Sequence, residues 1–289
     1  MKANAAEKVY KVATRNPSSV TSKATKTNPK IMYLRNIAVS CLSLYVASCN
    51  AATTLWLVGD STMAKGGGGA GTDGWGQYVS TYFNIPVVND AIGGTSARSY
   101  TVKGFFNNVY NQVKSGDWVI IEFGHNDVGS NPDNGNTDCA GNGYNTTCTV
   151  VDSGKSVVTH TYNYYIQNAI TTLAAKGVKT VVSSVTPDNI WPLGAGTGNR
   201  FVGYASLAAS RTGADYVDHY DYVVQAFKAL GQTKVNTFFP NNQHLHTSPA
   251  GAAVVAQAFV KGLSCGKSAL KSHLTSAANS IPNGCLSGL

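Results

Sequence analysis

Short apolar runs alternate along the chain with segments of helical pattern, and this alternation limits the fold more than any other feature. The apolar runs predict strands at residues 55–58, 87–90, 118–123, 179–185 and 214–218. The segments between and after them predict helices at residues 105–114, 160–176, 200–211, 221–230 and 249–262, with a shorter helix ending near Phe83. Strands that alternate with helices are typical of a parallel sheet covered on both faces. We therefore expect an α/β protein in which residues 52–289 form one domain.

Residues 1–51 differ in composition from the rest of the chain. Residues 1–31 are polar and basic, and we expect no packed structure there. From Met32 a short basic region, an apolar stretch from Ile37 to Ser48 and the small residues that follow have the layout of a secretory signal peptide. An alternative interpretation of residues 46–49 is a bacterial lipoprotein box, which the remaining cysteines disfavour. The sequence therefore predicts a secreted, extracellular protein.

The net charge of +8 belongs to this leader and not to the predicted domain. From Ala52 onward there are 14 basic and 13 acidic residues, a net charge of +1. A nucleic-acid partner needs a basic patch on the folded part, and the sequence shows none. No apolar run reaches the roughly 20 residues of a membrane span. We therefore expect neither a nucleic-acid partner nor a membrane anchor after cleavage of the signal peptide. We also expect the protein to be a monomer.

Four cysteines remain once Cys41 and Cys49 have left with the signal peptide. They are Cys139, Cys148, Cys265 and Cys285. An even number in a secreted chain indicates disulfides, and four cysteines allow three connectivities, of which local pairing is the simplest. A glycosylation sequon at Asn145 lies between the first two, as expected for an exposed loop. The C-x-x-C spacing of common zinc sites is absent from the sequence.

Polar groups follow three of the predicted strands and precede the last helix. They are Gly59-Asp60-Ser61, Gly93-Gly94, Gly124-His125-Asn126-Asp127 and His244-Leu245-His246. The carboxyl ends of parallel strands meet at one edge of the sheet, where such folds bind ligands. An acyl-transfer site needs a nucleophile, a base and donors for the oxyanion. Ser61, His246, the Gly94 amide and the Asn126 side chain supply them, although Ser61 by itself also fits a helix cap.

These blocks resemble the SGNH hydrolases, and more specifically the fungal rhamnogalacturonan acetylesterases. The similarity covers nearly all of residues 53–286 and is carried by the segments 57–64, 88–91, 96–100, 122–127, 216–219 and 246–251. The resemblance implies a three-layer α/β/α sandwich with a five-stranded parallel, flavodoxin-like sheet. It also implies removal of acetyl groups from rhamnogalacturonan, an acetylated plant cell-wall polysaccharide, without a cofactor or a metal.

The resemblance assigns a role to each candidate site residue. Ser61 is the nucleophile and offers its backbone N–H to the oxyanion, together with Gly94 and Asn126. His246 is the general base. The resemblance also implies the disulfides Cys139–Cys148 and Cys265–Cys285.

One position departs from the family pattern. The family carries an Asp three residues before the catalytic His, where this chain has Gln243 in a stretch that looks one residue longer. The third triad member is then the Gln243 amide, a backbone carbonyl, or a distant acid such as Asp218. The missing acid leaves a pectin-binding pseudoenzyme with the same fold as an alternative function. A second alternative is an SGNH esterase that acts on another acetylated polysaccharide.

Other residues near the predicted site have both structural and functional interpretations. We expect His125 to pack or hydrogen-bond, and Asp60 to hydrogen-bond the backbone of its own turn. Arg98 fits an ion pair with a substrate carboxylate or with a protein acid equally well. The pair His244 and His246 has metal-ligand spacing, but no third ligand of the usual type lies nearby in the sequence.

Two loops and a group of aromatic residues complete the predicted rim. The glycine-rich segment 66–71 lacks Walker spacing, so we expect a flexible rim loop. Residues 129–156 form a long polar loop in this prediction. Four aromatic residues are candidates for lining a sugar groove or for the core: Trp75, Tyr100, Trp191 and Tyr204.

Overall fold

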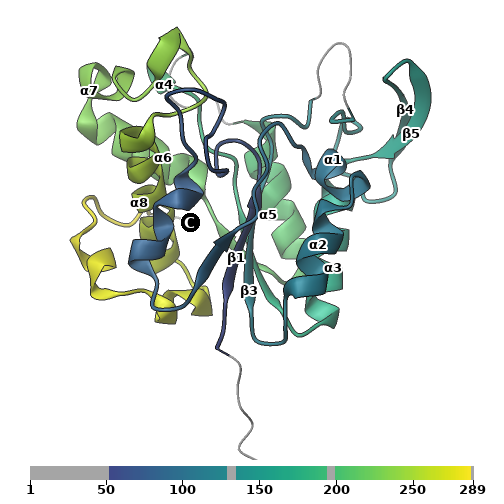
Figure 1. The fold of residues 1–289 in the computed structure, drawn as a ribbon, viewed down its shortest axis with the longest axis horizontal. Helices are drawn as coiled ribbons and strands as arrows, with labels where there is room; N and C mark the ends of the chain where they lie inside the picture. Colours follow the sequence, from purple (N-terminus) through teal and green to yellow (C-terminus); the bar gives the residue numbers. More distant parts are fainter. Residues whose placement is uncertain (1–51, 129–134, 194–198, 288–289) are drawn as a thin grey trace, which may run out of the picture. The chain divides into compact units, whose positions relative to one another are not determined.

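A five-stranded parallel sheet forms the centre of the molecule (Figure 1). The computed structural model describes residues 52–128, 135–193 and 199–287, so the predicted leader and signal peptide lie outside the described residues. The strand order is β2-β1-β3-β6-β7, and every neighbouring pair is parallel. The strands are β1 (Leu55–Gly59), β2 (Val87–Asn89), β3 (Trp118–Glu122), β6 (Lys179–Ser183) and β7 (Asp215–Val217). This is the flavodoxin-like order, which confirms the predicted fold class.

Helices cover both faces of the sheet, giving three layers (Figure 1). One layer contains α1 (Ala97–Val102), α2 (Phe105–Gln112), α3 (Tyr162–Ala175) and α5 (Arg200–Thr212). The other contains α6 (His219–Leu230) and α8 (Pro249–Cys265), with the 3₁₀ helices Trp75–Gln77 and Val79–Tyr82 packed beside α8. The short helices α4 (Ile190–Leu193) and α7 (Gln232–Asn236) lie at the upper edge in the figure. Further 3₁₀ turns occur at Pro240–Asn242, Ala269–His273 and Ser276–Ser280.

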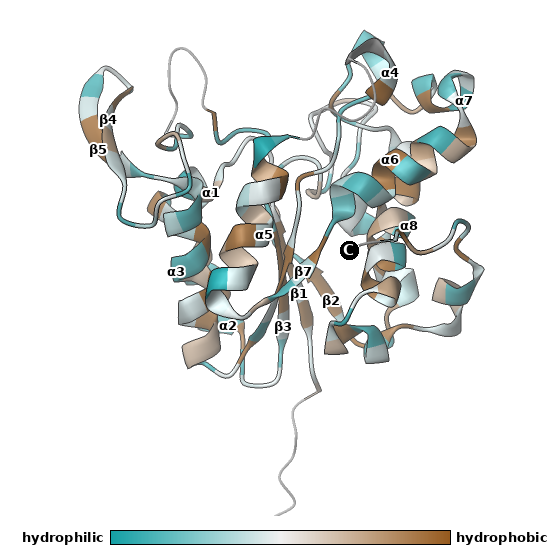
Figure 2. Cartoon of the chain, turned by 180° about the vertical axis from the view of Figure 1, so that it is seen from behind, coloured by the Kyte–Doolittle hydropathy of each residue, from teal (hydrophilic) through white to brown (hydrophobic). Residues whose placement is uncertain are grey.

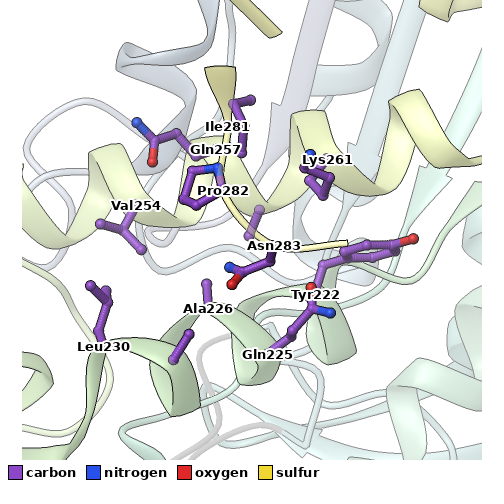
Figure 3. Close-up of a pocket in the computed structure, with 12 residues that line it drawn as sticks. Tyr222, Gln225, Ala226, Leu230, Val254, Gln257, Lys261, Ile281, Pro282 and Asn283 are labelled. Atoms are coloured by element: carbon purple, nitrogen blue, oxygen red, sulfur yellow. The ribbon is translucent and has the colours of Figure 1, made fainter. Parts of the chain in front are cut away.

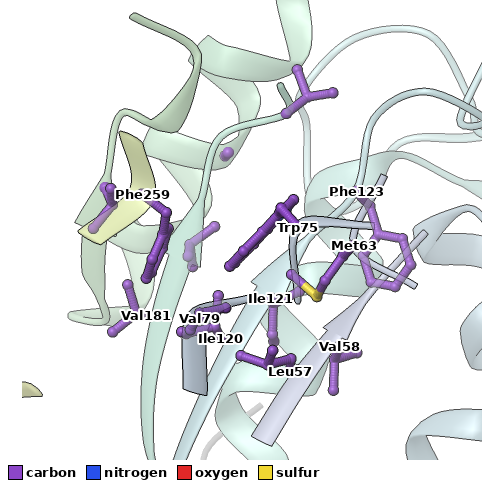
Figure 4. Close-up of a cluster of buried hydrophobic side chains, with 14 of the residues drawn as sticks. Leu57, Val58, Met63, Trp75, Val79, Ile120, Ile121, Phe123, Val181 and Phe259 are labelled. Atoms are coloured by element: carbon purple, nitrogen blue, oxygen red, sulfur yellow. The ribbon is translucent and has the colours of Figure 1, made fainter. Parts of the chain in front are cut away.

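Apolar side chains of β1 and β3 form the centre of the core (Figure 4). Both strands are buried along their whole length, as their continuous apolar runs predict. The register aligns Leu55 with Trp118 and Gly59 with Glu122. The two strands therefore end side by side, which brings the polar groups after each strand to the same edge of the sheet.

The N-terminus of α8 is capped by a serine side chain. Ser248 is the N-cap, and its side chain accepts a hydrogen bond from the Gly251 N–H, while Pro249 occupies the first turn. Proline is favoured there because it has no N–H to leave unpaired and its φ angle suits the helix. The cap fixes the start of the helix at Pro249, three residues after His246.

The prediction of a long polar loop at residues 129–156 is wrong for its second half. Strands β4 (Thr147–Asp152) and β5 (Lys155–His160) form an antiparallel hairpin, which occupies His160 so that α3 begins at Tyr162. The turn residues Ser153 and Gly154 both have positive φ, as tight hairpin turns require. The hairpin was missed because its strands are largely exposed and lack a continuous apolar run.

Both disulfides pair locally: Cys139 with Cys148, and Cys265 with Cys285. Asn145 lies in the loop that the first disulfide closes, and its side chain is exposed. Within the described ranges, no helix combines the length and the apolar character needed to cross a membrane.

Candidate active site

Ser61 lies in the turn that follows β1. Gly59 ends the strand, and a Cβ atom there would lie only 2.6 Å from the Glu122 carbonyl oxygen, so glycine allows β1 to approach β3. The Asp60 carboxylate accepts hydrogen bonds from both the N–H and the hydroxyl of Thr62, at 2.9 and 2.8 Å. This confirms the prediction that Asp60 hydrogen-bonds its own turn. The turn leaves Ser61 at the carboxyl edge of the sheet.

Three side chains that are distant in sequence form a hydrogen-bonded row. Ser61 Oγ lies 2.8 Å from His246 Nε2, and His246 Nδ1 lies 2.7 Å from Gln243 Oε1. The amide oxygen only accepts, so Nδ1 carries the ring proton and Nε2 presents its lone pair to the Ser61 hydroxyl. This is the tautomer that a general base for Ser61 needs.

The structure places Gln243, among the three predicted options, beside His246. Asp218 caps α6 instead, where its side chain accepts hydrogen bonds from the Asp221 N–H and the Ser184 hydroxyl. The His246 segment is held by its backbone, because the Asp73 N–H donates to the Thr247 carbonyl at 2.9 Å. The arrangement is a Ser–His–amide row with no carboxylate in direct contact with the ring among the described residues.

Burial lowers the pKa of the His246 imidazole, and the nearby His125 lowers it further. The carboxylates of Asp60 and Asp188 act in the opposite direction without cancelling the shift. A lowered pKa keeps the ring neutral at lower pH, because the charged form is the one that burial penalises. His246 is therefore able to accept a proton under mildly acidic conditions.

Besides the Ser61 N–H, the candidate donors for an oxyanion lie in the loops that follow β2 and β3, and a Cβ atom at Gly93 would lie 3.7 Å from the Ser61 Cβ. The Asn126 side-chain nitrogen donates one hydrogen to the Thr95 carbonyl at 2.9 Å and has a second to give. Gly94 has φ of +73°, a left-handed conformation that favours glycine, and its carbonyl accepts from Asn136 Nδ2. In the described part of the chain, the N–H groups of Ser61 and Gly94 donate to no backbone carbonyl. Each of the three candidate donors thus has an N–H group free of a backbone or Thr95 acceptor in the described part of the chain.

Two other candidates have structural partners. His125 Nε2 lies 3.1 Å from the Thr186 hydroxyl and its Nδ1 lies 3.8 Å from Asp188, as expected for a hydrogen-bonding residue. Arg98 is buried and forms an ion pair with Asp152 at 2.9 Å. Of the two interpretations of Arg98, the ion pair with a protein acid is therefore correct.

Two of the four aromatic residues that were candidates for lining a sugar groove belong to the core instead. Trp75 is fully buried and donates to Glu122 at 2.8 Å, and Tyr100 is buried and donates to the Asp90 carbonyl. Tyr204 packs against Phe201, and Trp191 is partly buried. For the pair His244 and His246, no cluster of three metal-ligating side chains is found within the described ranges.

A buried polar network below the site was not predicted. The Glu122 carboxylate accepts from Trp75 and Ser183 and lies 2.7 Å from His219 Nδ1, while His219 Nε2 faces the Val255 carbonyl at 2.9 Å. The signal was present in the sequence, since an acid at the end of a buried strand needs a partner. The partner itself lies 97 residues away.

An apolar pocket of about 230 Å³ lies between α6 and α8 (Figure 3). Ala226, Leu230 and Val254 line it together with the tail residues Ile281 and Pro282. None of the candidate site residues lines it. It is separate from the row of Ser61, His246 and Gln243.

Comparison with known proteins identifies the family of this chain and several relatives. Residues 57–254 match the family described as the GDSL-like Lipase/Acylhydrolase family. A protein of Emericella nidulans named rhamnogalacturonan acetylesterase is 46% identical over 245 residues, which cover 84% of this chain and 96% of that protein. A Bacillus subtilis protein named probable rhamnogalacturonan acetylesterase YesY is 26% identical over 223 residues, 73% of this chain and 93% of that protein.

Solved structures show the same fold. Protein YXIM from Bacillus subtilis superposes with a TM-score of 0.59 at 18% identity over 74% of this chain, and this chain spans only 56% of that chain. A catalytic mutant of Axe2, an acetylxylan esterase from Geobacillus stearothermophilus, superposes with a TM-score of 0.50 at 18% identity, covering 74% of this chain and 94% of that one.

Proposed function

The chain belongs to the GDSL-like Lipase/Acylhydrolase family and is a carboxylic-ester hydrolase, and we propose that it removes acetyl groups from rhamnogalacturonan through an acyl-enzyme on Ser61. The observation that carries the proposal is the 2.8 Å contact between Ser61 Oγ and Nε2 of His246, the ring nitrogen that has no proton when Nδ1 donates to Gln243. A serine hydroxyl is a weak nucleophile unless a base in hydrogen-bond contact removes its proton.

In the first half of the reaction, Ser61 Oγ attacks the acetyl carbonyl while His246 Nε2 takes the hydroxyl proton. The negative charge moves to the carbonyl oxygen, where the N–H groups of Ser61 and Gly94 and the Asn126 amide stabilise it. The imidazolium then gives its proton to the leaving sugar oxygen. The products of this half are the deacetylated sugar and an acetyl ester on Ser61.

In the second half, His246 acts again as the base. It takes a proton from a water molecule, which attacks the acetyl-enzyme, and returns that proton to Ser61 Oγ as acetate leaves. In both halves the base, the nucleophile and the oxyanion donors are groups of the protein, and water is the second acceptor of the acetyl group. Throughout, the Gln243 oxygen keeps the Nδ1 proton in place, which holds Nε2 toward Ser61.

The substrate is inferred from the relatives. The Emericella nidulans relative is named for rhamnogalacturonan, and it is aligned with this chain over nearly its whole length. We extend to this chain an acetylated polysaccharide as substrate, and we further propose that the protein is secreted and acts as a monomer. The two disulfides support an oxidising, extracellular location, because such bonds persist there.

Acetate release tests the function. Protein produced from Ala52 onward is incubated with acetylated rhamnogalacturonan, with acetylated xylan as the comparison substrate, and free acetate is measured. We expect faster release from rhamnogalacturonan, and Ser61→Ala should abolish release while the melting temperature stays close to the parent's. Equal or faster release from xylan would reject the proposed substrate, and full activity of Ser61→Ala would reject the acyl-enzyme.

A further inference from the structure

The glycine-rich loop of residues 66–71 lies against the ring of His246. A Cβ atom added at Gly68 would lie 2.2 Å from His246 Nδ1 and 2.4 Å from the ring atoms Cε1 and Cγ. Non-bonded atoms do not approach so closely, so the backbone of Gly68 leaves no room for a side chain beside the ring. Gly68 does not have the left-handed φ of Gly66, Gly67 and Gly69. The reason for glycine at this position is therefore space, not backbone conformation.

Hydrogen bonds hold the loop in place. The Gly66 N–H donates to Asp73 Oδ1 at 2.8 Å, and the Thr72 hydroxyl donates to the Gly69 carbonyl at 2.7 Å. The loop also contacts the segment that carries Gln243, because Asn241 Nδ2 donates to the Ala70 carbonyl at 3.3 Å. The loop and the His246 segment are thus fixed to each other, and the expected flexible rim is instead a hydrogen-bonded wall.

With an amide at position 243, the orientation of the His246 ring depends more on packing. A hydrogen bond to a carboxylate is roughly twice as strong as one to a neutral amide oxygen. The Gln243 oxygen therefore orients the His246 ring less firmly than an acid does. Close packing against one face of the ring, over Nδ1, restricts the tilting and rotation that a weaker hydrogen bond permits.

We propose that Gly68 is a positioning residue, whose bare backbone holds the His246 ring in the row between Ser61 and Gln243. The proposal rests on the proposed function only in its kinetic part, because the packing itself exists whether or not the site turns over. Gly68 touches no reacting atom; it acts through His246.

The kinetic test compares Gly68→Ala with Gly66→Asn, using an aryl acetate substrate. A methyl group at residue 68 displaces the ring, and a misplacement of about 1 Å costs up to about 10²-fold in rate. We expect kcat to fall by roughly 10- to 100-fold, with KM within about threefold of the parent. Gly66→Asn adds a larger side chain to the same loop where no atom lies within 4 Å, and asparagine tolerates left-handed φ, so kcat should stay near the parent value.

The pH profile of kcat/KM separates a positioning role of Gly68 from a general structural defect. Burial and the neighbouring charges set the lowered pKa of His246, so a displaced ring should have a different pKa. The acid limb of the kcat/KM profile should therefore shift in Gly68→Ala and stay in place in Gly66→Asn. A Gly68→Ala enzyme with kcat within twofold of the parent, or with an unmoved acid limb, would overturn the proposal.

A stability cycle tests the packing without any activity. Removing the ring by His246→Ala removes the clash, so Gly68→Ala should lower the melting temperature of the parent but hardly change that of the His246→Ala protein. If Gly68→Ala does not fold in the parent, folding of the double variant supports the proposal. An equal loss in both backgrounds, or failure of both to fold, overturns it. An inactive but folded parent would reject the proposed function and leave this cycle valid.

Discussion

The side-chain oxygen Oε1 of Gln243 lies 2.7 Å from Nδ1 of His246, in the place where related hydrolases are expected to carry a carboxylate. The contact gives the ring a defined tautomer but no negative charge. The distinction matters because His246 becomes positive when it takes the Ser61 proton, and an amide stabilises that charge less than a carboxylate.

Gln243→Glu should raise kcat/KM by about tenfold or more, within the roughly 10⁴-fold range attributed to a triad acid. Glutamate has the shape of glutamine, so its carboxylate oxygen takes the position of Oε1 without moving the backbone. Steady-state kinetics on an aryl acetate measures the gain. Gln243→Leu is the matched control, and it should lose activity because Nδ1 has no acceptor. No gain in the Glu variant would mean that another group already stabilises the imidazolium.

The pH dependence of the parent follows from the lowered pKa of His246. The group is active when neutral, so kcat/KM should rise with pH through this pKa and then level off, with its midpoint below the ordinary value of about 6.5. Gln243→Glu should move the midpoint upward, since a nearby carboxylate favours the charged ring. Profiles of kcat/KM from pH 4 to 8 test both statements, and a parent midpoint above 6.5 would contradict the first.

Asn126→Ala should lower kcat by about 10²- to 10³-fold, the usual cost of one oxyanion donor. Little change in KM is expected, because the amide acts on charge that develops only in the transition state. The loss of the bond to Thr95 also affects the loop, so the melting temperature of the variant must be measured beside its kinetics. A loss expressed mainly in KM would assign Asn126 to substrate binding instead.

Glu122→Gln should lower the free energy of unfolding by about 1–3 kcal/mol, as expected when the shared acceptor of a buried hydrogen-bond network is replaced. Glu122 and His219 are 1% and 0% exposed, and the carboxylate also holds Trp75. Urea denaturation measures the loss. Asp188→Asn removes an acid that is 41% exposed, and it should change stability by less than about 0.5 kcal/mol. Equal losses of unfolding free energy in the two variants would show that the buried network contributes no more to stability than an exposed acid.

Removal of the Cys139–Cys148 disulfide by a double serine substitution should lower the free energy of unfolding by about 2–4 kcal/mol. The bond closes the short loop that precedes the β4–β5 hairpin. Thermal or urea unfolding measures the change, and peptide mapping of the non-reduced parent checks the pairing. A cross-linked peptide joining Cys139 or Cys148 to the C-terminal pair would refute this connectivity.

The sequence by itself determined the parallel sheet and the order of its elements. Continuous apolar runs such as Trp118–Glu122 have one stable location, inside a sheet covered on both faces, and this follows from local composition. The polar residues after the runs then had to meet at one edge. Ser61, Gly94, Asn126 and His246 were therefore identifiable as a group before any distance was known.

Only the tertiary structure decided which partners these residues have. Gln243, Asp218 and a backbone carbonyl were equally open for His246, because a hydrogen bond depends on side-chain positions that local patterns do not specify. The same holds for the pairs Arg98–Asp152 and Glu122–His219, whose members lie 54 and 97 residues apart. The glycine loop shows the limit most plainly. A run of glycines predicts backbone freedom, whereas the close approach of Gly68 to His246 arises only when distant segments pack together, because packing is a property of three-dimensional contact and not of sequence order.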